Sequence, residues 1–315
     1  MKKVLILLDV IIMFIAAIAF FSYKEKLAMD REVSSAKEVS TSSEVSFGVI
    51  GDLHEKIDNF YKLAEDFHEI NPQMDALIMN GDVVGQGIPS QYESVKKALD
   101  KKSSILPKII ISNIGNHEFF DYNIEQNSPE QVEVFKKRYL DFSGEELVYH
   151  DKWIKEYHFI SLGSESGNTQ ELGSMKAFLS DKQLKWLEEK LAEKYVKGKP
   201  IFVFLHQPLN NNGKGFTGVE QGQQVKDILS RYPEVVLFTS HTHAPLDEKG
   251  IKTNLPFTTV HTGAVAYTIV TDGSGNRQNV NYNQGLYVEV NNGKVTIKGR
   301  SFNDKKWLFS KDISE

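Results

Sequence analysis

The chain has 315 residues, of which 40% are hydrophobic and 25% are charged, as expected for a globular protein and not for a disordered or fibrous one. Its formal net charge is −5 and no stretch is strongly basic, so nucleic acid is not the favoured partner, while a small anionic ligand is compatible. The sequence contains no cysteine, which excludes disulfides, thiolate metal sites and cysteine nucleophiles.

The first segment of the sequence is apolar from residue 4 to residue 21 apart from Asp9, and it follows Met1-Lys2-Lys3. Such a helix would be ~27 Å long, close to the ~30 Å hydrocarbon core of a bilayer. Ala17-Ile18-Ala19 has the form of a cleavage site but lies inside the apolar run, which favours an uncleaved signal-anchor over 1–23. We therefore expect a membrane-anchored, extracytoplasmic protein, or a secreted one if the segment is cleaved.

Residues 24–44 are polar and show no apolar periodicity, so they are predicted to form a flexible linker. The folded domain is predicted over 45–315. Within it, short β-branched runs alternate with amphipathic stretches, which implies an α/β sheet fold. The predicted strands are 45–50, 76–79, 108–114, 156–162, 200–205 and 235–239. The predicted helices are 56–70, 90–101, 129–142, 181–195 and 222–232.

After His243 the pattern changes and strands dominate, over 257–261, 264–270, 285–290 and 294–301. Asn291-Asn292-Gly293 predicts a tight hairpin between the last two. Three loops are rich in Gly, Asn and Gln and are predicted to border a site, namely 164–173, 210–222 and 272–284.

Five predicted strands end in residues of metal-ligand type. These ends are Gly51-Asp52-Leu53-His54, Asn80-Gly81-Asp82, Gly115-Asn116-His117-Glu118, His206-Gln207-Pro208 and Ser240-His241-Thr242-His243. In open α/β sheets ligands bind at the carboxyl ends of strands, so these five segments can converge. Carboxylate, imidazole and amide ligands suit Mn, Fe, Zn or Co.

Spacing within two of the motifs supports convergence. Asp52 and His54 are two residues apart, as are His241 and His243, which would put each pair on one side of an extended segment. Any one of these motifs alone is usually a turn or a structural histidine, but five of the nine histidines lie at strand ends. The other four are expected to be structural, namely His68, His150, His158 and His261. Of these, only His261, which follows a predicted strand, is placed to approach the site.

The ordered set of motifs resembles that of the calcineurin-like metallophosphoesterases, D-x-H, G-D, G-N-H-[DE], H and G-H-x-H, over residues 45–302. The resemblance includes a closing strand over 284–290. One departure is Ser240, where the family usually has glycine. The resemblance implies a four-layer α-β-β-α sandwich with the metal site at the carboxyl ends of the strands.

The resemblance also implies a binuclear site in which Asp82 bridges two metal ions. One ion would be bound by Asp52, His54, Asp82 and His243, and the other by Asp82, Asn116, His206 and His241. Two such cations, ~3.5–4 Å apart, would hold a hydroxide that attacks phosphorus. His117 is expected to assist the leaving group. Glu118 is expected either to orient the His117 ring, which we favour, or to cap the following helix.

The expected activity is hydrolysis of phosphoric esters, with phosphodiesters favoured over phosphomonoesters. Expected substrates are nucleotides, cyclic nucleotides, and lipid or wall-polymer head groups. A phosphoprotein phosphatase is a weaker alternative, because Val83-Val84-Gly85-Gln86-Gly87 lacks the Asp and Arg that those enzymes carry. A purple acid phosphatase would need tyrosine where Gly85 stands. A non-catalytic binding or sensor module is disfavoured by the complete ligand set and by His117.

Overall fold

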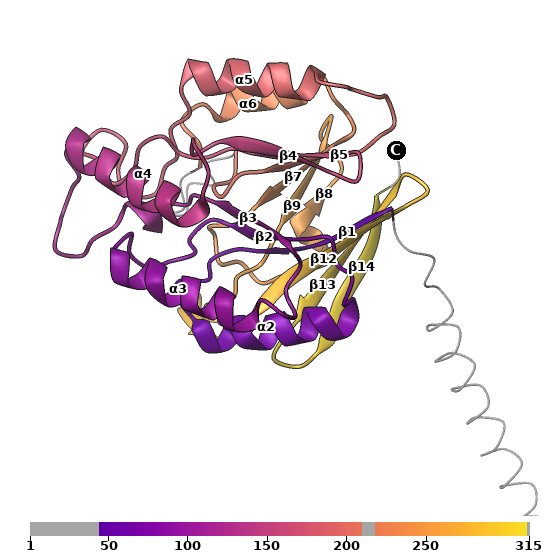
Figure 1. Ribbon diagram of the computed structural model, residues 1–315, viewed down its shortest axis with the longest axis horizontal. Helices are drawn as coiled ribbons and strands as arrows, with labels where there is room; N and C mark the ends of the chain where they lie inside the picture. Colours follow the sequence, from indigo (N-terminus) through magenta and orange to yellow (C-terminus); the bar gives the residue numbers. More distant parts are fainter. Residues whose placement is uncertain (1–43, 210–217, 314–315) are drawn as a thin grey trace, which may run out of the picture. The chain divides into compact units, whose positions relative to one another are not determined.

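The computed structural model describes residues 44–209 and 218–313. Within these residues two six-stranded sheets pack face to face, and helices cover their outer faces (Figure 1). This arrangement is the predicted four-layer α-β-β-α sandwich. Both sheets contribute strand ends that carry the predicted ligands.

The first sheet has the strand order β14-β13-β12-β1-β2-β3. Its parallel half consists of β1 (Val45–Ile50), β2 (Ala76–Asn80) and β3 (Ile109–Asn113). Its antiparallel half consists of β12 (Gln284–Asn291), β13 (Lys294–Ser301) and β14 (Lys306–Ile313). β1 is buried along its whole length because it is central and covered on both faces.

The second sheet has the order β4-β5-β6-β7-β9-β8. Four central strands are parallel: β5 (Tyr157–Ser161), β6 (Ile201–Phe204), β7 (Val235–Thr239) and β9 (Thr258–His261). Antiparallel strands form the edges, β4 (His150–Ile154) and β8 (Ile251–Lys252). Aromatic side chains fill the space between the sheets, where the Phe47 ring lies 4.9 Å from Phe159 and 4.8 Å from Phe202.

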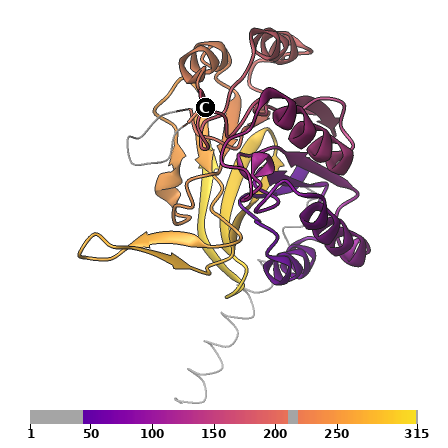
Figure 2. The same ribbon diagram turned by 90° about the vertical axis from the view of Figure 1, so that its left-hand side faces the viewer.

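Helices close both outer faces of the sandwich. α2 (Ile57–Ile70), α3 (Pro89–Lys102) and α4 (Pro129–Ser143) pack against the first sheet. α5 (Asp181–Ala192) and α6 (Gly222–Leu229) pack against the second. Two short 3-10 helices are also present, η1 (His117–Phe119) and η2 (Glu248–Gly250). β10 (Thr268–Thr271) and β11 (Arg277–Val280) form a separate ribbon that extends from the sandwich as an orange arm (Figure 2).

All five predicted helices and the predicted strands of the α/β part are present, and no end is shifted by more than three residues. Asn292 and Gly293 form the predicted turn, both with positive φ. Four strands were not predicted, namely β4, β8, β11 and β14. The strand predicted over 264–270 begins only at Thr268, and β11 lies in what was predicted to be a loop.

The predicted anchor, residues 1–23, and residues 24–43 of the predicted linker lie outside the described residues. Among the helices within 44–209 and 218–313, none is long and apolar enough to cross a membrane.

Candidate metal centre

The seven predicted metal ligands lie together at the carboxyl ends of β1, β2, β3, β6 and β7. Six of them are buried, and His54 is partly buried. Six of the seven, all but Asn116, form three overlapping groups together with His117, namely Asp52-His54-His243, His54-Asp82-His117 and Asp82-His206-His241. Within each group the ligand atoms lie within 4.8 Å of one another. The groups share His54 and Asp82, as a site for two neighbouring ions requires.

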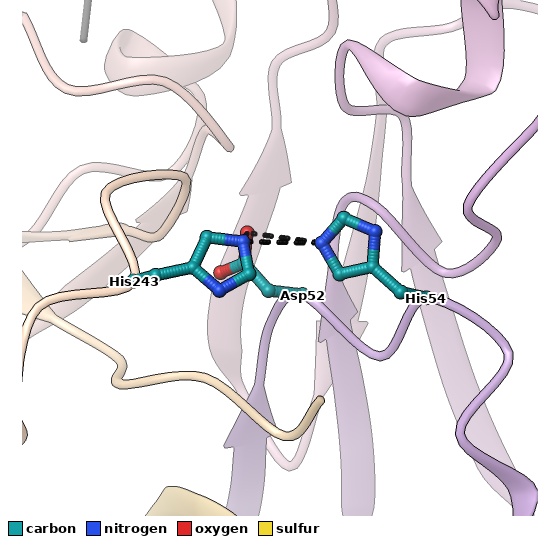
Figure 3. A group of neighbouring side chains, drawn as sticks. All are labelled: Asp52, His54 and His243. Atoms are coloured by element: carbon teal, nitrogen blue, oxygen red, sulfur yellow. Dashed lines mark hydrogen bonds and ion pairs between the residues drawn. The ribbon is translucent and has the colours of Figure 1, made fainter. Parts of the chain in front are cut away.

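One half of the centre is formed by Asp52, His54 and His243. The Nε2 atoms of His54 and His243 are 3.1 Å apart. Asp52 Oδ1 is 3.2 Å from His243 Nε2 and 3.9 Å from His54 Nε2. Figure 3 shows the His54 ring directed at the His243 ring and the Asp52 carboxylate. Two imidazole nitrogens and a carboxylate oxygen that face one another in this way are suited to a shared cation.

Asp82 connects this half to the other. Its Oδ2 atom is 3.1 Å from His206 Nε2 and 3.8 Å from His54 Nε2, so one oxygen faces histidines of both halves. Its Oδ1 atom accepts a hydrogen bond from the His117 backbone N–H at 2.8 Å. Asp82 therefore faces both halves of the centre, as a residue that bridged two ions would, and its bridging role stays a prediction of the family resemblance.

Asn116 gives the strongest sign that the centre is built for a ligand. Its side-chain oxygen is buried and has no hydrogen-bond partner among the residues that the structure describes. The same holds for Asp52 Oδ1. Leaving a buried polar atom without a partner costs about 1–3 kcal/mol, so such atoms are rare unless they bind something. Oxygens of this kind, next to imidazole nitrogens, fit the metal ions that the resemblance implies.

The backbone brings the paired ligands together in a different way from the one predicted. Asp52 and His54 were expected in an extended segment, but their φ angles are 54° and 46°. His241 and His243 likewise have φ angles of 71° and 52°. Left-handed residues turn the chain sharply, so each pair converges through a tight loop and not through strand alternation. Non-glycine residues rarely adopt this conformation, which costs of order 1–3 kcal/mol each and is concentrated at functional sites.

Two glycines make the close approach of the ligand loops possible. A Cβ atom on Gly81, whose φ is +86°, would lie 2.4 Å from the His206 ring. A Cβ atom on Gly115 would lie 2.2 Å from Asp82 Oδ1. Any side chain at either position would therefore displace a ligand.

Backbone carbonyls fix the orientation of three imidazoles. His206 Nδ1 is 2.8 Å from the Asn80 carbonyl, and His243 Nδ1 is 2.7 Å from the Tyr267 carbonyl. His117 Nδ1 is 2.8 Å from the Gly85 carbonyl. Because a carbonyl only accepts, each Nδ1 must carry the hydrogen, and each Nε2 is left for the centre. Metal-binding histidines are typically oriented by contacts of this kind.

The charges of the centre are strongly coupled. Burial lowers the pKa of His54 well below its usual value and lowers the pKa of His241 to about 3. For His206, burial is outweighed by the Asp82 and Asp52 carboxylates, which raise the pKa to about 9. Burial would raise the pKa of Asp82, but the neighbouring histidines hold it well below the usual range. A bound cation would take the place of the His206 proton, since imidazole binds metal only when neutral.

Glu118 makes neither of its two expected contacts. Its buried carboxylate accepts hydrogen bonds from the backbone N–H groups of Asp82, Val83 and Gly115, at 3.0, 2.7 and 2.6 Å. The Nδ1 atom of His117 is bonded to Gly85 instead, and η1 has no side-chain cap. Glu118 therefore ties the loop after β2 to the loop after β3 and does not orient the His117 ring. Burial and the nearby Asp82 charge raise the pKa of Glu118 to about 7.

A buried polar network beneath the centre was not predicted from the sequence. Asn113 Nδ2 donates to Asn80 Oδ1 at 2.8 Å, and Asn80 Nδ2 donates to Ser240 Oγ at 3.0 Å. Ser240 Oγ is in turn 2.7 Å from Thr262 Oγ1. The network crosses from the first sheet to the second and gives the unusual Ser240 a role in holding them together. The only signal in the sequence was that these residues lie at strand ends.

The remaining histidines lie outside the three ligand groups. His261 approaches the site, and its Nε2 atom is 2.7 Å from Thr242 Oγ1, between the ligands His241 and His243. His158 lies in β5, 2.8 Å from Asp151 Oδ2, and His150 lies in β4 near the Ser112 carbonyl. The Tyr267 ring stacks on the His243 ring, with their centroids 4.1 Å apart. Tyr267 was not predicted as a site residue, because it lies in a segment that was predicted to be a strand.

Solved structures with this arrangement of sheets and helices are known. A dimetal phosphatase from Danio rerio aligns with a TM-score of 0.58 at 14% identity, over 87% of this chain and 99% of that chain. A purple acid phosphatase from yellow lupin (Lupinus luteus) aligns with a TM-score of 0.59 at 12% identity, over 86% of this chain and 53% of that chain. At these identities the likeness concerns the fold alone.

Two curated relatives are 25% identical to parts of the chain. One, from Enterobacter lignolyticus, is named glycerophosphodiester phosphodiesterase GpdQ and matches over 54% of this chain and 56% of its own length. The other, from Nostoc sp., is named 3',5'-cyclic-nucleotide phosphodiesterase and matches over 59% of this chain and 62% of its own length. The chain thus spans less than two thirds of either relative.

A family model described as calcineurin-like phosphoesterase matches residues 45–245. This range contains all seven candidate ligands together with His117 and Glu118. The chain therefore belongs to the calcineurin-like phosphoesterase family.

Proposed function

We propose that this protein is a metal-dependent phosphoesterase that prefers phosphodiesters and acts on the extracytoplasmic side of a membrane. The observation that carries the proposal is a pair of buried oxygens that accept no hydrogen bond from the described residues, Asp52 Oδ1 and Asn116 Oδ1. They lie among histidine side chains at the ends of five strands. A site of this kind needs cations to compensate its buried polar atoms. The family to which the chain belongs uses such cations to hydrolyse phosphate esters.

The ligand set fits two ions from among Mn, Fe, Zn and Co. Asp52, His54, Asp82 and His243 would hold one ion, and Asp82, Asn116, His206 and His241 the other. When bound, two such cations supply Lewis acidity to a phosphoryl group and hydroxide at neutral pH.

His117 would be the proton donor to the leaving oxygen. Its Nδ1–H donates to the Gly85 carbonyl and its backbone N–H donates to Asp82, so both the ring and the main chain are fixed. Its ring lies 4.3 Å from the His54 ring, next to the ligands. A fixed imidazole with a free Nε2 atom can bind a proton and deliver it to a nearby alkoxide.

The names of the two relatives support phosphodiesters as the substrate class, because both are called phosphodiesterases. The apolar segment predicted over 1–23 supports a location at the membrane. Small diesters and nucleotides, including cyclic nucleotides, and lipid or wall-polymer head groups are therefore the candidate substrates.

The proposal is tested with the purified full-length protein in a mild detergent after addition of Mn²⁺. Hydrolysis of bis(p-nitrophenyl) phosphate is compared with hydrolysis of p-nitrophenyl phosphate and of a phosphoserine peptide, each with and without EDTA. We expect the diester to be cleaved fastest and EDTA to abolish the reaction.

Each other result points to a different function. Faster cleavage of p-nitrophenyl phosphate would make the protein a phosphomonoesterase, and faster cleavage of the peptide would make it a phosphoprotein phosphatase. If none of the three is cleaved while metal is bound, the protein is a metal-dependent binding or sensor module.

A further inference from the structure

An open cleft of about 660 Å³ begins beside the metal centre and runs between the start of α2 and the β10–β11 ribbon. Tyr267 is part of the cleft and also contacts the metal centre. It lines the cleft, its ring stacks on the ligand His243, and its carbonyl accepts the hydrogen bond from His243 Nδ1. The ring of Tyr267 also lies 5.9 Å from that of His54. The cleft therefore adjoins the metal centre at Tyr267.

Three asparagines line the cleft, namely Asn59, Asn279 and Asn281. Asn59 is buried and donates to the Val265 carbonyl at 2.7 Å and to Asn281 Oδ1 at 2.8 Å. Asn279 and Asn281 lie on the ribbon side of the cleft and are exposed. The Asn59 amide is thus used inside the protein, and the exposed amides of Asn279 and Asn281 are the ones that a ligand can reach. A side-chain amide offers both donors and an acceptor, the combination that binds hydroxyl groups.

The charges that line the cleft cancel. Lys56 and Lys62 are opposed by Glu55 and Asp58. A cleft with this balance does not favour a second anionic or cationic group. Its preferred occupant is polar, carries hydroxyl groups and has no net charge, while the negative charge of a phosphodiester would remain at the metal centre.

We propose that this cleft binds one ester substituent of a phosphodiester and selects a small polyol, such as a glycerol group, over an apolar substituent. The inference rests on the proposed function, since it assigns the part of the substrate that does not react. It also predicts that residues of the cleft determine specificity without contacting the reacting atoms, and the exposed Asn279 is one of them.

The ribbon provides a matched pair of variants for the test. Asn279 pairs with Ile269 and Gln278 with Val270, so the two residues are neighbours on β11, and both are exposed. Successive strand residues point to opposite faces, and only Asn279 lines the cleft. Asn279→Leu and Gln278→Leu therefore make the same chemical change on opposite faces of one strand. Asn279→Ala removes the amide without adding bulk.

The test compares two diesters with the same leaving group, glyceryl p-nitrophenyl phosphate and methyl p-nitrophenyl phosphate, using the full-length protein loaded with Mn²⁺. For the unmodified protein we expect kcat/KM to be about tenfold higher with the glyceryl diester than with the methyl diester. One or two net hydrogen bonds to the glyceryl group would provide a difference of this size. Asn279→Leu and Asn279→Ala should both bring this ratio down towards one. Gln278→Leu should keep it.

The inference is overturned if the unmodified protein shows no preference for the glyceryl diester, or if both Asn279 variants keep the preference. It is also overturned if Gln278→Leu lowers the ratio as much as Asn279→Leu does. Failure of the proposed function looks different, because metal-loaded protein would then cleave neither diester at all, and the inference would fall with it.

Discussion

The carboxylate of Glu118 is a structural acceptor inside the Asn116-His117-Glu118 motif. It accepts from the backbone N–H groups of Asp82, Val83 and Gly115, and so joins two ligand loops. The neighbouring His117 is fixed by a carbonyl and leaves one ring nitrogen towards the centre. Two adjacent residues of one motif thus have separate tasks, which a variant of each can distinguish.

Replacing Glu118 by alanine should destabilise the fold. The substitution leaves buried N–H groups without an acceptor, at about 1–3 kcal/mol each, so we expect the free energy of unfolding to fall by about 3 kcal/mol or more. Urea denaturation measures the change. Glu118→Gln, which keeps one acceptor oxygen, is the control and should lose less. An unchanged urea midpoint for Glu118→Ala would contradict the structural role.

Replacing His117 by alanine should instead affect turnover. If the ring delivers the proton to the leaving oxygen, kcat should fall by about 10²- to 10⁴-fold. Metal content, measured by elemental analysis after gel filtration, should not change. Loss of metal from the variant would show that His117 is a ligand and not the proton donor.

At the scale of secondary-structure elements, the sequence predicted what lies in the core and missed what lies at the edges. β1, β2, β6 and β7 are continuous apolar runs because they are covered on both faces. β14 and β11 are largely exposed, so their composition resembles that of a loop. Apolar residues in the sequence reveal a strand only where most of that strand is buried.

The candidate site shows the same limit. The side chains that meet at the candidate site could be predicted because residue type and order carry that information. The left-handed conformations of Asp52 and His241 could not, since they are imposed by tertiary contacts and oppose local preference. Tyr267 and the cleft beside it could not be predicted either, because they depend on how the ribbon meets α2.

The β12–β13 hairpin allows an element-scale prediction. Gly293 has a φ of +75°, a conformation in which alanine is strained, so Gly293→Ala should lower the free energy of unfolding by about 1 kcal/mol. Diester hydrolysis should not change, because the turn lies at the end of β12 remote from the ligands. Gly273→Ala is the control, since Gly273 has open space around its Cβ position and no positive φ. If Gly293→Ala and Gly273→Ala had the same free energy of unfolding, the glycine at this turn would not contribute to stability as predicted.

At the scale of the whole molecule, the metal centre lies between the two sheets. β1, β2 and β3 supply Asp52, His54, Asp82 and Asn116, while β6 and β7 of the other sheet supply His206, His241 and His243. Cations held there would link the halves of the sandwich. Metal binding should therefore stabilise the folded domain as a whole.

Saturation with Mn²⁺ should raise the melting temperature. An ion present at 100 times its dissociation constant stabilises the folded state by about 2.7 kcal/mol, which corresponds to roughly 5–10 °C for a domain of this size. Calorimetry with Mn²⁺ and with EDTA measures the shift, and His206→Ala should reduce it. Identical melting temperatures in Mn²⁺ and EDTA would count against a metal centre.

The seven candidate ligands are spread from residue 52 to residue 243, and they meet only when both sheets have formed. A nascent or partly folded chain therefore offers no high-affinity chelate, and metal capture comes late in folding. The ion that the protein acquires is then set by the supply in the compartment where folding finishes, as well as by the preference of the ligands. Protein produced in a different host compartment should be examined for mismetallation before its activity is compared.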